Sequence, residues 1–140
     1  MKPFARQILM TGVLSLSGLV AINSAQAQIS ADGTVSTEVT QSGNVFEIRE
    51  GSKAGSNLFH SFQEFSLPSG NTAFFKNGAN ITNIITRVTG GSISRIDGLI
   101  QANGGANLIL INPKGISFGP NAQLDIGGSF LGSTADSVRF

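Results

Sequence analysis

Short apolar runs separated by turn-forming residues make up most of the chain. The clearest run is residues 108–111, four consecutive Leu and Ile residues that end at Asn112-Pro113. An apolar run this short, bounded by turn signals, is typical of a strand buried on both faces. Proline has no N–H to contribute to a sheet, so the strand is expected to end there.

Further short strands are expected at nearly even spacing after this one. They are predicted at residues 116–118, 123–126 and 129–131, each followed by a glycine-containing turn. The segment 96–99 matches 116–119 at a spacing of 20 residues. Short strands turned at regular intervals predict coils stacked into a solenoid rather than a sandwich.

The upstream half shows apolar residues at every second position. Residues 34–40 and 44–50 form a predicted hairpin turned at 41–43, and 51–55 is expected to be a loop. Residues 80–89 alternate in the same way. The stretch 58–65 is crowded with Leu58, Phe59, Phe62 and Phe65, a spacing that fits either one helical turn or a bulged strand. Core filling is the favoured role for these aromatics, and a binding platform is the alternative.

The first 27 residues have the pattern of a secretory signal peptide. Lys2 and Arg6 precede an uncharged apolar segment at 8–22, and Ala25 and Ala27 form a small–x–small cleavage pattern. We expect cleavage after Ala27. A membrane anchor is the alternative, but the apolar segment is shorter than the roughly 20 residues that a spanning helix needs. The predicted mature chain, residues 28–140, is the size of one domain.

The charge balance and the absence of cysteine narrow the function classes. Without Lys2 and Arg6, seven of the nine basic residues remain against eight acidic ones. A balanced chain without a basic cluster gives no electrostatic reason to expect nucleic-acid binding. An exported chain with no Cys must be held together by burial and backbone ladders instead of disulfides.

Candidate catalytic groups are sparse. His60 is the only histidine, and the eight carboxylates are scattered, with Asp97 and Asp125 the only pair that stacked turns would bring near each other. Neither a zinc-ligand spacing nor a phosphate-binding loop is present in the sequence. We therefore expect no enzyme activity, no cofactor and no metal, and we assign His60 a structural hydrogen-bonding role.

Three stretches together match one pattern: NLILINPKGISFGPNAQLDIGGSFLGST at 107–134, NLFHSF at 57–62 and IITRVTG at 84–90. They resemble the haemagglutination-activity, or two-partner secretion, domain at the N-terminus of filamentous-haemagglutinin-type exoproteins. The resemblance covers roughly residues 30–140. It implies an all-β, right-handed parallel β-helix with an N-terminal β-cap. Because family domains run further, we expect this one to be incomplete at its C-terminal end.

The resemblance also implies a function. It implies a secretion-targeting module that an outer-membrane β-barrel transporter recognises in the periplasm and exports to the cell surface or the medium. It names no host receptor, and it implies no transmembrane anchor in the mature chain. The alternatives are an adhesin or structural β-helix fragment, or a non-functional truncated remnant. A β-helical enzyme acting on polysaccharide ranks last.

Two segments are the candidate recognition sites by resemblance. The first is the family's Asn-Pro-x-Gly motif at Asn112, Pro113, Lys114 and Gly115, in which Lys114 stands where Asn is common. The second is the 57–62 segment: Asn57, Leu58, Phe59, His60, Ser61 and Phe62. A degenerate copy of the motif lies at Asn77 and Gly78, where glycine replaces proline. Whether the Asn-Pro turn contacts the transporter or only sets the register of two turns is left open.

Overall fold

The structure is a computed structural model that describes residues 28–136; the proposed signal segment, with Ala25 and Ala27, lies outside this range. Within it the chain forms thirteen strands and no helix, so the prediction of an all-β protein is confirmed. The part of the chain described also contains no helix long and apolar enough to cross a membrane.

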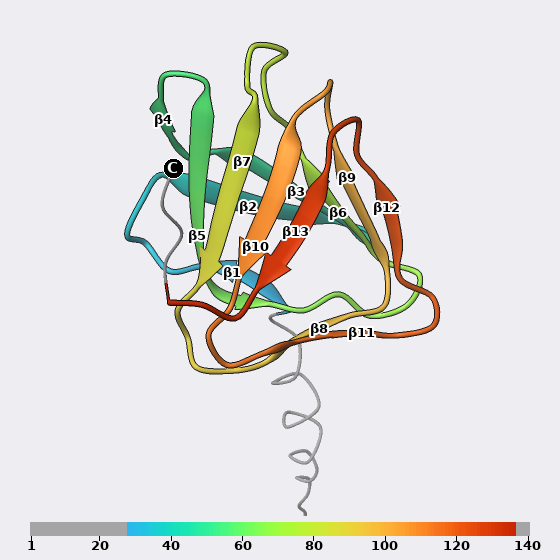
Figure 1. Cartoon of the computed structure of the whole chain (residues 1–140). Helices are drawn as coiled ribbons and strands as arrows, with labels where there is room; N and C mark the ends of the chain where they lie inside the picture. The colour runs from blue at the N-terminus through green and yellow to red at the C-terminus, as the bar shows by residue number, and fades with distance from the viewer. Residues whose placement is uncertain (1–27, 137–140) are drawn as a thin grey trace, which may run out of the picture.

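Three sheets wind around one core (Figure 1). The six-stranded sheet contains β1 (Ile29–Ala31), β4 (Ser52–Ala54), β5 (Asn57–Phe65), β7 (Asn83–Val88), β10 (Asn107–Ile111) and β13 (Phe130–Ser133). The five-stranded sheet contains β2 (Thr37–Ser42), β3 (Val45–Glu50), β6 (Thr72–Phe75), β9 (Leu99–Ala102) and β12 (Gln123–Asp125). The two-stranded sheet contains β8 (Ser94–Ile96) and β11 (Ile116–Phe118).

The chain visits these sheets in the same order in each turn. From β3 onward it passes from the five-stranded to the six-stranded sheet, then along the side that β8 and β11 occupy, and back again. Strands of successive turns pair in parallel, as β7 with β10 and β6 with β9. About four turns are stacked in this way, and the predicted parallel solenoid is confirmed.

The core consists of rows of inward-facing side chains, one from each turn. Leu58, Ile84 and Leu108 stack in register and are at most 4% exposed. Phe46, Ala73 and Ile100 form an equivalent row from the five-stranded sheet, at most 3% exposed. Because each row repeats one position of the coil, burial of the apolar positions sets the register between turns.

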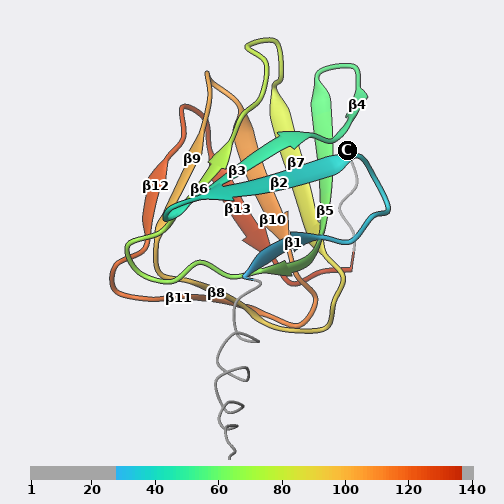
Figure 2. The ribbon, with the colours of Figure 1, turned by 180° about the vertical axis from the view of Figure 1, so that it is seen from behind.

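The N-terminal end of the solenoid is covered by antiparallel strands. β2 pairs with β3, and both β1 and β4 pair with β5 (Figure 2). These strands occupy the N–H and C=O groups that the first parallel strands would otherwise expose to edge pairing. The predicted cap is therefore present.

Two details of the sequence interpretation are wrong. Residues 51–55 are not only a loop, because β4 forms there and covers the start of β5. The repeat pairs Ile96 with Phe118 and not with Ile116, a spacing of 22 residues. In the hairpin, β2 starts at Thr37 and runs to Ser42, so the turn lies at Gly43-Asn44.

The 58–65 stretch is a bulged strand and not a helical turn. The register between β1 and β5 shifts so that Ala31 pairs with Phe62 while Ser30 pairs with Glu64, which leaves Gln63 as the extra residue. The bulge lets Phe62 and Phe65, three positions apart, both point into the core, where each is at most 2% exposed. Their rings pack edge to face with centroids 5.1 Å apart. Core filling is thus the role that the fold gives these two aromatics.

Candidate functional site

The Asn-Pro turn (residues 112–115) joins β10 to β11 and is tied to its neighbours by Asn112. The side chain of Asn112 is fully buried. Its Nδ2 donates to the Ser92 carbonyl oxygen at 2.9 Å and to Ser94 Oγ at 3.0 Å, in the preceding turn of the solenoid. Its Oδ1 accepts the Lys114 N–H at 2.9 Å, which closes the local turn.

Backbone bonds complete the same turn. Gly115 N–H donates to the Asn112 carbonyl at 3.0 Å, and Gly115 has φ +129°, a conformation that favours glycine. Asn112 N–H donates to the carbonyl of Ser133 in the following turn. One asparagine therefore connects three successive turns, while Pro113 and Lys114 face solvent.

A hollow of about 240 Å³ lies beside this exposed pair. Pro113, Lys114 and Ile111 form one wall, and the segment after β7 forms the other. Arg87 and Asp136 also reach it, so the hollow has apolar walls with charged groups at its margin.

The 57–62 segment is β5, and most of it is inaccessible in the folded domain. Leu58, His60, Ser61 and Phe62 are at most 4% exposed. Phe59 faces outward and packs against three buried Ile residues of β7 and β10: Ile85, Ile109 and Ile111. The segment therefore offers little side-chain surface to a partner once the domain has folded.

Asn57 begins a ladder of asparagines at one corner of the solenoid. Asn83 Nδ2 donates to Asn57 Oδ1 at 2.9 Å, and Asn107 Nδ2 donates to Asn83 Oδ1 at 3.0 Å. Asn107 Oδ1 then accepts the Ser129 N–H of the last turn. Stacked amides of this kind satisfy one another along a set of parallel strands.

His60 is a buried structural residue, as the sequence predicted. It is 3% exposed and lies between Phe62 and Phe75, with ring centroids 6.0 and 5.6 Å away. Its Nδ1 is 3.1 Å from Thr37 Oγ1, whose lone pair already accepts the Ser61 N–H. Burial lowers the pKa of His60 from 6.5 to about 4, so the ring is neutral at physiological pH.

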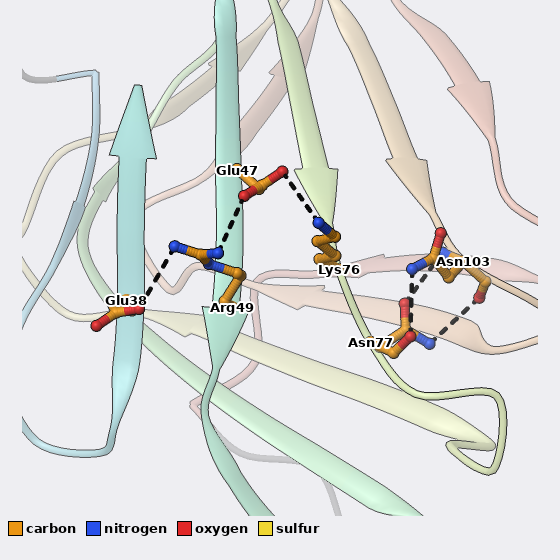
Figure 3. Close-up of polar contacts among 6 residues, drawn as sticks. All are labelled: Glu38, Glu47, Arg49, Lys76, Asn77 and Asn103. Atoms are coloured by element: carbon orange, nitrogen blue, oxygen red, sulfur yellow. Dashed lines mark hydrogen bonds and ion pairs between the residues drawn. The ribbon is translucent and has the colours of Figure 1, made fainter. Parts of the chain in front are cut away.

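Asn77 of the degenerate motif pairs with Asn103, one turn later in the solenoid (Figure 3). Asn77 Oδ1 accepts the Asn103 N–H at 3.0 Å, and Asn77 Nδ2 donates to the Asn103 carbonyl at 3.2 Å. Asn103 Nδ2 returns a bond to the Asn77 carbonyl at 3.2 Å. The asparagine thus joins two turns even though glycine replaces the proline of the motif.

Four alternating charges lie beside this pair on the outside of the five-stranded sheet (Figure 3). Arg49 is 3.9 Å from Glu38 and 3.5 Å from Glu47, and Glu47 is 3.7 Å from Lys76. Such exposed pairs contribute at most about 1 kcal/mol each. Their arrangement across β2, β3 and β6 favours the observed strand register.

Sequence reasoning missed a hydrogen-bond cluster around Asp32. Its Oδ2 accepts the hydroxyls of Ser61 and Thr89, each at 2.6 Å, and its Oδ1 accepts both the N–H and the hydroxyl of Thr34. Burial raises the pKa of Asp32, but these hydrogen bonds outweigh it and hold the pKa well below 3.8. The Asp-Gly-Thr turn at 32–34 was the local signal. Its partners on β5 and after β7 could not be found locally.

Asp97 and Asp125 bind separate partners. Asp97 Oδ1 accepts the Asn121 N–H at 2.7 Å, and Asp125 Oδ2 accepts from Gln101 at 3.0 Å. No group of three or more His, Cys, Asp or Glu side chains that could hold a metal ion occurs within residues 28–136. The geometry of this part of the chain is that of a stacked scaffold with one exposed, rigid turn.

The comparison with protein-family models identifies the scaffold. The TPS secretion domain, the N-terminal domain of two-partner secretion, matches residues 27–140. No curated protein matches the sequence. The match covers the whole described solenoid, confirms the resemblance drawn from the three sequence stretches, and implies two-partner secretion of an exoprotein that is released or displayed at the surface. The chain therefore belongs to the TPS secretion domain family, a family of non-catalytic targeting modules.

Proposed function

We propose that this chain is the targeting module that an outer-membrane β-barrel transporter recognises in the periplasm and carries to the cell surface. The observation that carries the proposal is the match to the TPS secretion domain over residues 27–140. The signal-like segment supports it. The predicted cleavage after Ala27 would leave Gln28 first, and the Gln28 carbonyl already accepts a hydrogen bond from Ser66 N–H in the fold.

The Asn-Pro turn is the part of the folded domain that we assign to the transporter contact. The amide of Asn112 is buried and fully used within the solenoid, so a partner cannot read it directly. Its task is to fix the turn, and the exposed Pro113 ring and Lys114 ammonium group are what a partner meets. The hollow beside them gives that contact a concave wall.

The 57–62 segment serves the same transporter at an earlier stage. Four of its six side chains are buried in the folded domain, so a contact with them requires an unfolded chain. An extended segment in transit presents Leu58, Phe59 and Phe62 together. Folding at the surface then buries Leu58 and Phe62 and ends that contact.

The last turn fits a role in ordering chain that stacks on it. Phe118 and Leu124 occupy inward positions equivalent to Ile96 and Ile100, yet each is 50% exposed. An apolar strand added in parallel would bury both, at about 25 cal/mol per Å² of apolar area removed from water.

The test fuses residues 1–140 to a reporter in cells with and without a matching two-partner transporter. We expect surface reporter only where the transporter is present. The double variant Pro113→Ala with Lys114→Glu should lower surface reporter severalfold and leave the melting temperature of the purified chain nearly unchanged. Pro120→Ala is the matched control, because Pro120 lies in another exposed turn of the same coil.

Two outcomes contradict the proposal at different levels. Surface reporter without a transporter would overturn the targeting function. Normal secretion of the Pro113→Ala, Lys114→Glu variant would remove the Asn-Pro turn from recognition and leave the 57–62 segment as its site.

A further inference from the structure

The two Asn-Gly sequences of the chain, Asn77-Gly78 and Asn103-Gly104, are hydrogen-bonded to each other (Figure 3). They lie 26 residues apart, in consecutive turns of the solenoid. Each asparagine ends a strand region of the five-stranded sheet and precedes the loop that leads to the next sheet. The pairing places two chemically reactive bonds at one corner.

An Asn-Gly bond reacts spontaneously when the chain is flexible. The backbone nitrogen of the glycine attacks Cγ of the asparagine, an N–Cγ bond forms, and the Cγ–Nδ2 bond breaks. The amide leaves as ammonia with the proton of the attacking N–H, and water then opens the succinimide to aspartate or isoaspartate. Glycine permits the close approach because it has no Cβ, whereas proline cannot react because its nitrogen carries no hydrogen.

The replacement of proline by Gly78 in the degenerate motif therefore creates a reactive bond that Asn112-Pro113 lacks. In the fold, the Asn77 side chain is held away from this reaction. It is 8% exposed, its Oδ1 accepts from Asn103 N–H, and its Nδ2 donates to the carbonyls of Gly78 and Asn103. Ring closure requires the side chain to rotate and give up these bonds.

Asn103 is held less firmly. Its side chain makes one hydrogen bond in the described part of the chain, from Nδ2 to the Asn77 carbonyl, and it is only half-buried. The fold thus treats two chemically identical sequences differently.

We propose that Asn77 and Asn103 are spontaneous deamidation sites that folding protects, Asn77 more strongly than Asn103. Conversion at Asn77 places a carboxylate against the Asn103 carbonyl, and an isoaspartate lengthens the backbone by one methylene at a corner where two turns must stay in register. A chain that ages while unfolded loses the ability to stack these turns. The proposal rests on the two Asn-Gly bonds alone and is independent of the transporter.

The experiment incubates the purified chain at neutral pH, folded in buffer or unfolded in guanidinium chloride. Trypsin then releases residues 77–87 and 96–114 as separate peptides, and mass spectrometry resolves aspartate and isoaspartate in each. We expect similar conversion of Asn77 and Asn103 in denaturant, both faster than Asn121, which alanine follows. In the folded chain conversion at Asn77 should slow by roughly tenfold or more, the effect of losing two or three hydrogen bonds, and Asn103 should slow less.

Three results would overturn the proposal. They are equal conversion of Asn77 in folded and unfolded chain, faster conversion of Asn77 than of Asn103 in the folded chain, and conversion in denaturant no faster than that of Asn121. The variant Gly78→Pro, measured in denaturant so that folding is irrelevant, should abolish conversion at Asn77 and leave that at Asn103 unchanged. Persistent conversion at Asn77 in this variant would exclude the Gly78 nitrogen as the attacking group.

Discussion

Replacing Asn112 by alanine should destabilise the domain more than any exposed turn residue does. The change removes the two bonds from Nδ2 to Ser92 and Ser94 and the bond from the Lys114 N–H to Oδ1. It also leaves the Ser94 hydroxyl, which is fully buried, without that partner.

The magnitude follows from these contacts. Three hydrogen bonds contribute about 1 kcal/mol each, and a buried polar group left unpaired costs about 1–3 kcal/mol more. The free energy of unfolding should therefore fall by about 3–5 kcal/mol, which places Asn112→Ala among the largest single-residue effects. A free turn with no ties to neighbouring coils would lose only about 1 kcal/mol, the scale of a lost cap.

Urea unfolding of the purified chain measures this, with the midpoint shifted and the slope unchanged. Asn121→Ala is the control, because Asn121 is exposed and its amide makes only one long contact, 3.4 Å to Asp97. We expect that control to lie within about 0.5 kcal/mol of the parent. A loss below about 1 kcal/mol for Asn112→Ala, or equal losses for both variants, would refute the idea that Asn112 ties three turns together.

Two further predictions follow from the packing. A Cβ at Gly98 would collide with the Asn71 carbonyl of the previous turn, whereas a Cβ at Gly105 meets no atom within 4 Å; Gly98→Ala should cost about 1–3 kcal/mol by thermal unfolding and Gly105→Ala almost nothing. The His60 pKa of about 4 lies below the 6.5 of the unfolded chain, so only the unfolded chain gains a proton as pH falls. Stability should therefore decline between pH 6.5 and 4 by about 3 kcal/mol, and an unchanged pH slope in His60→Phe would contradict this.

Local patterns predicted the strands where they carry their own boundaries. β10 is a run of branched apolar residues stopped by a proline, and β7 alternates Ile84, Thr86 and Val88 inward, so a window of a few residues contains the information. The Asn-Pro turn was found for the same reason. The role of His60 also followed locally, since no second catalytic group accompanies it.

Long-range pairing was outside the reach of such windows. The repeat was read as 20 residues and is 22 between Ile96 and Phe118, because the length of each loop varies from turn to turn and only stacking of the inward rows decides it. β4 was missed because its three residues carry no apolar pattern and form a strand only by covering β5. The Asp32 cluster draws its partners from 29 and 57 residues away.

The sequence by itself determined that the chain is all-β, coiled in short parallel strands, exported in character and related to the two-partner secretion domains. These properties depend on composition, period and local turn chemistry, each of which is complete within a few neighbouring residues. Only the tertiary structure decided which side chains of the motifs are exposed. It buried Asn112 and most of the 57–62 segment, left Pro113 and Lys114 on the surface, and joined Asn77 to Asn103. The physical reason is that stacking one turn on the next determines both burial and hydrogen-bond partners, and residues more than 20 positions apart become neighbours only then.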